Sequence, residues 1–159
     1  SNLLVHRLDD PARAVRAASR AVKAGRSVAF SCPLAPPPLI ETLEEVIFSD
    51  PAFAPHRGSA SGLATWSCRP LDEWVDLVGQ AGFTSTSAHL IKAELAFASP
   101  SLLMAYWEAA TEGRFLGGLS DGEREAASSL ADERFGRHWG EKPLRSQVEV
   151  AFIHATRGD

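Results

Sequence analysis

The spacing of apolar residues predicts that helices and strands alternate along the chain. Apolar side chains recur at helical spacing behind Asp10 and Pro11, which suit a helix start, and they predict a helix over 11–24. A short apolar run at 27–32 follows and is typical of a strand buried on both faces. Residues 1–6 look like the end of an earlier strand. These three segments together predict one βαβ unit with parallel strands.

The rest of the chain continues the alternation. The pattern predicts a helix that is opened by the prolines at 36–38 and ends near Phe48, and then a helix from Pro70 to Gly82. A strand over 83–97 follows, and Ser99 and Pro100 open the next helix. Ser120-x-x-Glu123 opens a helix that ends near Phe135, and the last predicted element is a strand over 144–156. In the last strand, Val148, Val150 and Phe152 share one face. Residues 49–69 show no period, and a loop of this length is interpreted as lid-like. We expect residues 1–159 to form a single α/β domain.

Composition and charge limit the classes of function that the chain can have. The chain has 159 residues, of which 45% are hydrophobic and 23% charged, with a net charge of -4. No basic cluster indicates nucleic-acid binding, and no apolar run is long enough to span a membrane. The two cysteines, Cys32 and Cys68, lie outside any CxxC motif, so we expect a reduced, cytoplasmic protein. A zinc site made of Cys32, Cys68 and His56 is conceivable, but metal ligands usually lie closer in sequence, and we expect no metal.

Four segments carry a family resemblance. Asp9-Asp10-Pro11 is followed by Arg20-Ala21-Val22-Lys23-Ala24-Gly25, and Leu71-Asp72-Glu73-Trp74 is followed by Gln80-Ala81-Gly82-Phe83. In this order and spacing they resemble the "Dp…RvLkpGG" and "l…ll..aGF" stretches of class I S-adenosylmethionine-dependent methyltransferases of the type 11 kind. The likeness covers nearly the whole chain, although no single segment is specific.

The resemblance implies a Rossmann-like, three-layer α/β/α fold, of which this chain would be the C-terminal half. Residues 1–6 would end strand four and 28–31 would be strand five. Residues 144–156 would be strand seven, which runs antiparallel between strands five and six in this family. The family's Gly-rich turn after strand one and its acidic residue after strand two have no counterpart here, and Arg26 replaces the second Gly of the paired-Gly turn. We therefore expect a fragment that is inactive by itself.

Candidate site residues follow from the same resemblance. In open α/β sheets ligands bind beyond the carboxyl ends of the strands, so Asn2 and Leu3 would lie near the methionine part of S-adenosylmethionine. The loop after Cys32 and the segment 49–69 would cover the methyl acceptor. The bulky candidates for contact with that acceptor are Phe53, Trp66, Phe97 and Trp107. His6 and His56 are the candidates for a catalytic proton acceptor.

Each candidate also has a structural interpretation. Asn2 could simply satisfy a strand end, the tryptophan at 107 has the helical spacing of a core residue, and either histidine could be a surface or turn residue. Three functions stay open at this point. The first is a methyltransferase fragment acting on a small-molecule or carrier-bound acceptor. The second is a non-catalytic module that pairs with a partner, or with a second copy as a homodimer, through the exposed flank of strand four. The third is an unrelated α/β binding protein.

Overall fold

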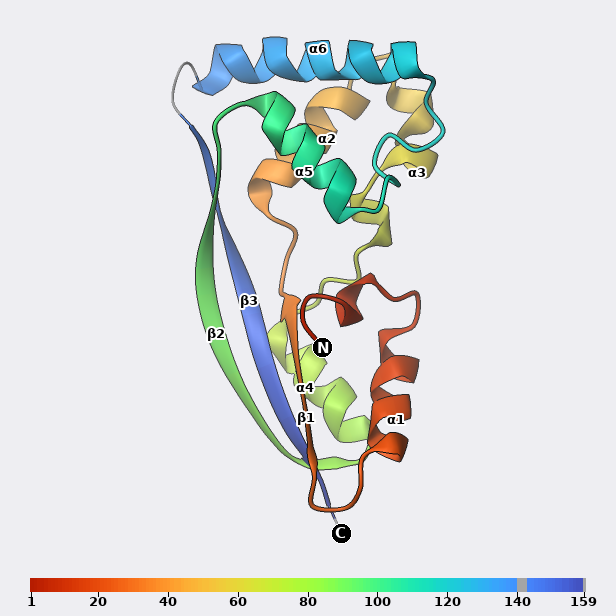
Figure 1. The fold of residues 1–159 in the computed structure, drawn as a ribbon, viewed down its shortest axis with the longest axis vertical. Coiled ribbons are helices and arrows are strands. Elements are labelled where there is room, and N and C mark those ends of the chain that lie inside the picture. Colours follow the sequence, from red (N-terminus) through yellow and green to blue (C-terminus); the bar gives the residue numbers. More distant parts are fainter. Residues whose placement is uncertain (140–142, 159) are drawn as a thin grey trace. The chain divides into compact units, whose positions relative to one another are not determined.

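The computed structural model describes residues 1–139 and 143–158, and Figure 1 shows its helices and strands. The strands are β1 (Ser27–Pro33), β2 (Phe83–Phe97) and β3 (Leu144–Arg157); the helices are α1 (Pro11–Ala21), α2 (Pro38–Phe48), α3 (Arg57–Ala60), α4 (Leu71–Gln80), α5 (Pro100–Ala110) and α6 (Asp121–Trp139); the 3-10 turns are η1 (Val5–Arg7), η2 (Ala54–His56) and η3 (Leu63–Thr65). The helices and strands predicted after residue 10 are confirmed, with shifted ends for α1 and α6, and the segment 49–69 carries η2, α3 and η3.

The sheet has the strand order β1-β3-β2, so the last strand of the chain lies in the middle. β1 and β3 run antiparallel, with Phe30 opposite Ile153 and Cys32 opposite Ala151. The family resemblance implied this position for the last strand, and the structure confirms it. The mixed α/β fold class with an antiparallel final strand is confirmed as well.

Residues 1–3 pair with the outer edge of β1 in the parallel direction. Asn2 forms an isolated parallel bridge to Ser31, which confirms the direction expected for a βαβ unit. The predicted strand end over 1–6 is too long, however. Leu3 takes a φ of 48°, which turns the backbone away from β1, and Val5–Arg7 close a 3-10 turn instead.

Contacts between residues divide the described chain into two compact units, one made of 1–36, 66–93 and 148–158, the other of 37–65, 94–139 and 143–147. In the first unit, α1 and α4 pack on the sheet through a shared apolar core. The main members of this core are Val5, Val15, Phe30, Cys32, Trp74, Leu77, Val78, Phe83, Ala151, Ile153 and Ala155.

The face of β3 that enters this core is the one with the smaller side chains. Ala151, Ile153 and Ala155 are buried, whereas Phe152 is 42% exposed on the other face. β1 is buried on both faces only from Phe30 to Pro33, so the predicted burial is confirmed for these residues and wrong for 27–29. One face of the sheet in this unit therefore remains partly open and apolar.

α1 ends at Ala21, three residues before the predicted end, because the next residue, Val22, takes an extended backbone conformation (φ -83°, ψ 134°). Arg157 Nη1 donates to the carbonyl oxygens of Ser19 (2.8 Å) and Val22 (2.7 Å). The turn into β1 then uses Gly25 at a φ of 68°, a conformation that glycine adopts without strain.

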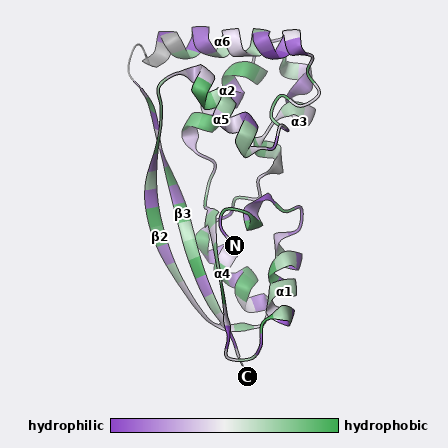
Figure 2. Ribbon diagram, in the orientation of Figure 1, coloured by the Kyte–Doolittle hydropathy of each residue, from purple (hydrophilic) through white to green (hydrophobic). Residues whose placement is uncertain are grey.

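The second unit is built mainly from helices, together with the end of β2 and the start of β3. Ile40, Leu43 and Ile47 of α2 are fully buried, as are Leu103 and Trp107 of α5. Figure 2 shows α6 as largely hydrophilic, and its buried side chains at Ala127, Ala131 and Phe135 form one narrow stripe. The predicted capping box is confirmed, because Ser120 N and Oγ both lie 2.7 Å from Glu123 Oε2.

Candidate functional site

The first candidate site is the strand end at Asn2 and Leu3, in the first unit. Ser31 N donates to the carbonyl oxygen of Ser1 (3.0 Å), and Leu3 N donates to the carbonyl oxygen of Ser31 (3.2 Å). The Ser31 hydroxyl, which is 2% exposed, donates to Asn2 Oδ1 and accepts from Leu3 N at 3.0 Å. Asn2 thus satisfies the strand end in this structure. A contact of Asn2 or Leu3 with a cofactor stays a prediction.

His6 follows this strand end and is buried in the turn η1, with 1% of its surface exposed. Its ring meets the ring of Trp66 edge-on, with centroids 4.7 Å apart, and its carbonyl oxygen accepts from Ser67 N at 2.6 Å. Burial, together with the positive charge of Arg7, lowers the pKa of His6 to about 4, so the ring is neutral near pH 7. Neither ring nitrogen has a hydrogen-bond partner among residues 1–139 and 143–158. The buried imidazole can therefore still accept one hydrogen bond and donate another.

An apolar cavity of about 430 Å³ lies beside the same strand end. Leu4 and Val5, α1, and the start of β1 enclose it; its lining is Ser1, Leu4, Val5, Leu8, Ala14, Val15, Ala18, Val28, Ala29 and Phe30. This lining suits an apolar group and provides almost no side-chain hydrogen bonds.

The cysteines offer little chemistry. Burial, with a smaller contribution from Cys68, raises the pKa of the Cys32 thiol to about 12, so the thiol stays protonated and unreactive. Within the described part of the chain, no group of three His, Cys, Asp or Glu side chains is placed to hold a metal ion.

The second candidate site surrounds Glu44, a buried carboxylate in the second unit. Glu44 is 5% exposed, and its Oε1 accepts from Trp107 Nε1 (2.7 Å) and from Leu63 N (3.0 Å). Its Oε2 accepts from the Ser61 hydroxyl. A cavity of about 280 Å³ opens beside it, lined by Glu41, Glu44, Glu45, Arg57, Ser61 and Leu63. The three donors fix the segment around Ser61 against α2 and α5.

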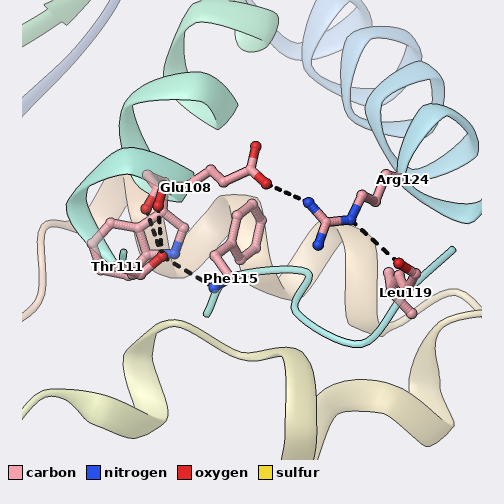
Figure 3. A network of polar contacts seen from close by, with 6 residues as sticks. Glu108, Thr111, Phe115, Leu119 and Arg124 are labelled. Atoms are coloured by element: carbon pink, nitrogen blue, oxygen red, sulfur yellow. Dashed lines mark hydrogen bonds and ion pairs between the residues drawn. The ribbon is translucent and has the colours of Figure 1, made fainter. Parts of the chain in front are cut away.

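The turn after α5 is held by a polar network that Figure 3 shows. Thr111 is fully buried, and its hydroxyl donates to the Trp107 carbonyl oxygen (2.8 Å) and accepts from Phe115 N (3.0 Å). Arg124 of α6 reaches back to the carboxylate of Glu108 and to the carbonyl oxygen of Leu119. The network fixes the loop between α5 and α6, and with it the end of the helix that carries Trp107.

The predicted site residues fall into two groups. Asn2, Leu3, His6 and Trp66 belong to the first unit, where His6 and Trp66 are in contact, whereas Phe53, His56, Phe97 and Trp107 belong to the second. In the second unit, Phe53 is 6% exposed and Trp107 fully buried, which are the positions of core residues. Phe97 is half-buried against Tyr106 at a ring distance of 5.1 Å, and His56 is half-buried at the end of η2.

Sequence reasoning missed Glu44. Its position carried a signal, because Glu44 stands in register with Ile40, Leu43 and Ile47 on the apolar stripe of α2. A carboxylate on such a stripe needs buried donors, and the structure supplies them.

No protein-family model matches this sequence, and no curated protein matches it either. Solved structures do match. BH2331 from Bacillus halodurans C-125, a protein assigned as a methyltransferase, is similar with a TM-score of 0.57 and 12% identity, and YcgJ from Bacillus subtilis with a TM-score of 0.55 and 12% identity. Each match covers 99% of this chain and 62% of the other. A weaker likeness, with a TM-score of 0.46 and 13% identity, is to phosphoethanolamine N-methyltransferase 2 of Haemonchus contortus in complex with S-adenosyl-L-methionine; it covers 100% of this chain and 32% of that one.

The chain therefore has the fold of BH2331 and YcgJ, and it spans about three fifths of the length of each. Among the residues that the structure describes, no helix has both the length and the apolar character needed to cross a membrane.

Proposed function

We propose that the chain is the C-terminal part of an S-adenosylmethionine-dependent methyltransferase that acts on a small-molecule or carrier-bound acceptor. The observation that supports this most is the strand arrangement, in which β3 lies antiparallel between β1 and β2 while Asn2 pairs in parallel with the free edge of β1. The family resemblance of the sequence implies this position for each of these strands. The structural likeness to BH2331 agrees with it.

The described residues fit one wall of a cofactor site. Asn2 and Leu3 lie at the carboxyl end of a segment parallel to β1, where ligands of α/β sheets bind. The sequence contains no strand followed by a Gly-rich turn, so the chain has no cradle for the rest of the cofactor. S-adenosylmethionine supplies an electrophilic methyl group when bound. In this proposal, the protein around it mainly aligns the acceptor and excludes water.

His6 is the residue beside this wall that has free hydrogen-bonding capacity in its side chain. It follows the strand end by a few residues, it is neutral near pH 7, and its two ring nitrogens have unused hydrogen-bonding capacity within the described chain. A pKa of about 4 makes it a weak base, so its role in this proposal is to orient an acceptor by a hydrogen bond. Trp66, packed against it, would limit the space that an acceptor can occupy.

Calorimetry with S-adenosylmethionine and S-adenosylhomocysteine tests the proposal. We expect micromolar binding by the full-length protein, including the part encoded upstream of Ser1, and no measurable binding by the 159 residues alone. Tight binding by the 159 residues would show that the cofactor site is misplaced. Absence of binding by the full-length protein, or an upstream sequence without a strand and a Gly-rich turn, would refute the enzyme.

A second function is favoured by the exposed apolar residues at the start of the chain. Leu3 is 45% and Leu4 50% exposed, next to the free flank of the Asn2 bridge. A non-catalytic module would bury this flank against a partner. Leu4→Asp in the 159-residue chain discriminates: loss of association in light scattering would support this function, and a well-folded monomer of the unaltered chain would exclude it.

A further inference from the structure

The outer edge of β2 is open and long. β2 has 15 residues and is the last strand of the sheet, and no strand of the described chain pairs with its outer side. Leu90 and Ile91 in its middle are 53% and 50% exposed. The strand contains no proline that would block further pairing. An edge of this kind can accept another strand.

Charged side chains on β2 and β3 form two ion pairs of opposite polarity. Lys92 Nζ on β2 lies 3.1 Å from Glu149 Oε1 on β3. Two residues further along β2, Glu94 forms an ion pair with Arg145 of β3. Lys92 and Glu94 are separated by a single residue, so they stand on the same face of the strand. They are 70% and 50% exposed and remain open on the side away from β3.

This order of charges is self-complementary about Ala93. If a second copy of β2 pairs antiparallel with the first around a two-fold axis at Ala93, Lys92 comes to lie opposite Glu94 of the partner subunit. The row across the four strands then alternates in sign: Glu149, Lys92, Glu94 of the partner subunit, Arg145 of the partner subunit. On the other face, Ile91 comes to lie opposite Leu95 of the partner subunit.

A lone lysine on an edge strand usually discourages pairing. Here Glu94 follows Lys92 by two residues, so a second copy of β2 in the register centred on Ala93 meets opposite charges instead of like charges. The charge order thus favours a second copy of the same strand over an arbitrary edge.

We propose that β2 is a dimerisation edge, and that two copies of the chain join through β2 in antiparallel register centred on Ala93 into one continuous sheet. The proposal does not depend on cofactor binding or on catalysis, because it uses the edge of the sheet opposite to the Asn2 bridge.

Cysteine cross-linking of the full-length protein tests the register. In this register the two Ala93 Cα atoms lie about 4.5–5.5 Å apart, within disulfide range. Ala93→Cys should therefore give a disulfide-linked dimer on a non-reducing gel. Ser87→Cys is the matched control on the same strand, because its two copies lie about 40 Å apart in this register. Both variants keep Cys32 and Cys68, so any background is equal. Equal cross-linking of both variants, or of neither, would overturn the proposal.

Charge reversal tests the partner contact. Lys92→Glu and Glu94→Lys each place like charges opposite each other twice per dimer, and each should raise the dimer dissociation constant about tenfold or more. The double variant restores opposite charges across the two-fold axis, while it places like charges beside Glu149 and Arg145 within each copy. Because those two contacts lie within one copy, the dissociation constant should still return to within about threefold of the starting protein. Thermal melts by circular dichroism confirm that each variant is folded. A monomer of the unaltered protein at about 100 μM in light scattering, a dissociation constant unchanged by Lys92→Glu, or no rescue by the double variant would each refute it.

Discussion

The buried carboxylate of Glu44 gives the sharpest stability prediction. In Glu44→Leu the side chain keeps its apolar neighbours but offers no acceptor to three donors. The Trp107 indole N–H is fully buried, so its loss of a partner costs about 1–3 kcal/mol. Leu63 N and the Ser61 hydroxyl are part-buried and can turn to water, which adds about 0–1 kcal/mol each. We expect a total loss of about 3 kcal/mol in the free energy of unfolding.

Glu44→Gln separates the hydrogen bonds from the charge. A glutamine oxygen can still accept from Trp107 and Leu63, and its amide can donate to the Ser61 oxygen, so the loss should be about 1 kcal/mol. Glu41→Gln is the control on the same helix. Its side chain is exposed beside the same cavity, and the change should stay within about 0.5 kcal/mol.

Urea unfolding followed by far-UV circular dichroism at pH 7 measures all three variants. A double-mutant cycle with Trp107→Phe isolates the bond itself. The double variant should lose about 1–2 kcal/mol less than the sum of the single variants, because either change removes the same hydrogen bond. Equal losses for Glu44→Leu and Glu44→Gln, or a coupling energy of zero, would refute this account of the second unit.

Three further predictions follow from contacts and burial. Gly62→Ala places a methyl group about 2.7 Å from Trp107 Nε1 and should lower the free energy of unfolding, measured in urea, by about 1–3 kcal/mol. Gly58→Ala is the control, because nothing lies within 4 Å of its added methyl group, and it should be neutral or slightly stabilising. An unchanged free energy of unfolding in Gly62→Ala would contradict the packing around Trp107. Arg157→Met removes the two hydrogen bonds from Arg157 to the carbonyl oxygens at the end of α1 and should lower the free energy of unfolding by about 1–2 kcal/mol. The backbone amides at the end of α1 should then exchange their hydrogens faster. Burial holds the pKa of His6 at about 4, below its ordinary 6.5, so the unfolded state binds the extra proton. This group should not affect the free energy of unfolding above about pH 6.5, and it should lower that free energy by about 2–3 kcal/mol as the pH drops towards 4. In His6→Gln the free energy of unfolding should depend less on pH between 6.5 and 4. A free energy of unfolding that stays constant over this range in the unaltered protein would contradict the burial of His6.

Much of the fold could be predicted because it depends on local rules. Phe83–Phe97 was predicted at its observed bounds, since alternation and a preceding glycine define it without help from distant residues. The capping box at Ser120 and the start of α4 after Pro70 are local in the same way. The position of the last strand between β1 and β2 came from the family resemblance instead.

The candidate site was only partly predictable. Asn2, Leu3, His6 and Trp66 lie in the same unit, and His6 contacts Trp66, but their roles remain predictions. The donors that meet Glu44 come from α5 and from the segment near Ser61, far apart in sequence, so no local pattern could pair them.

The sequence by itself determined where helices and strands form, because periodicity, caps and turns act over a few residues. Only the tertiary structure decided which face of β3 is covered, and it buried Ala151 and Ile153 while leaving Phe152 exposed. It also brought an arginine from more than a hundred residues away to the last carbonyl groups of α1. Both outcomes depend on which side of the sheet the helices occupy and on which donors reach the free carbonyl groups, and these are properties of the packed chain rather than of any segment within it.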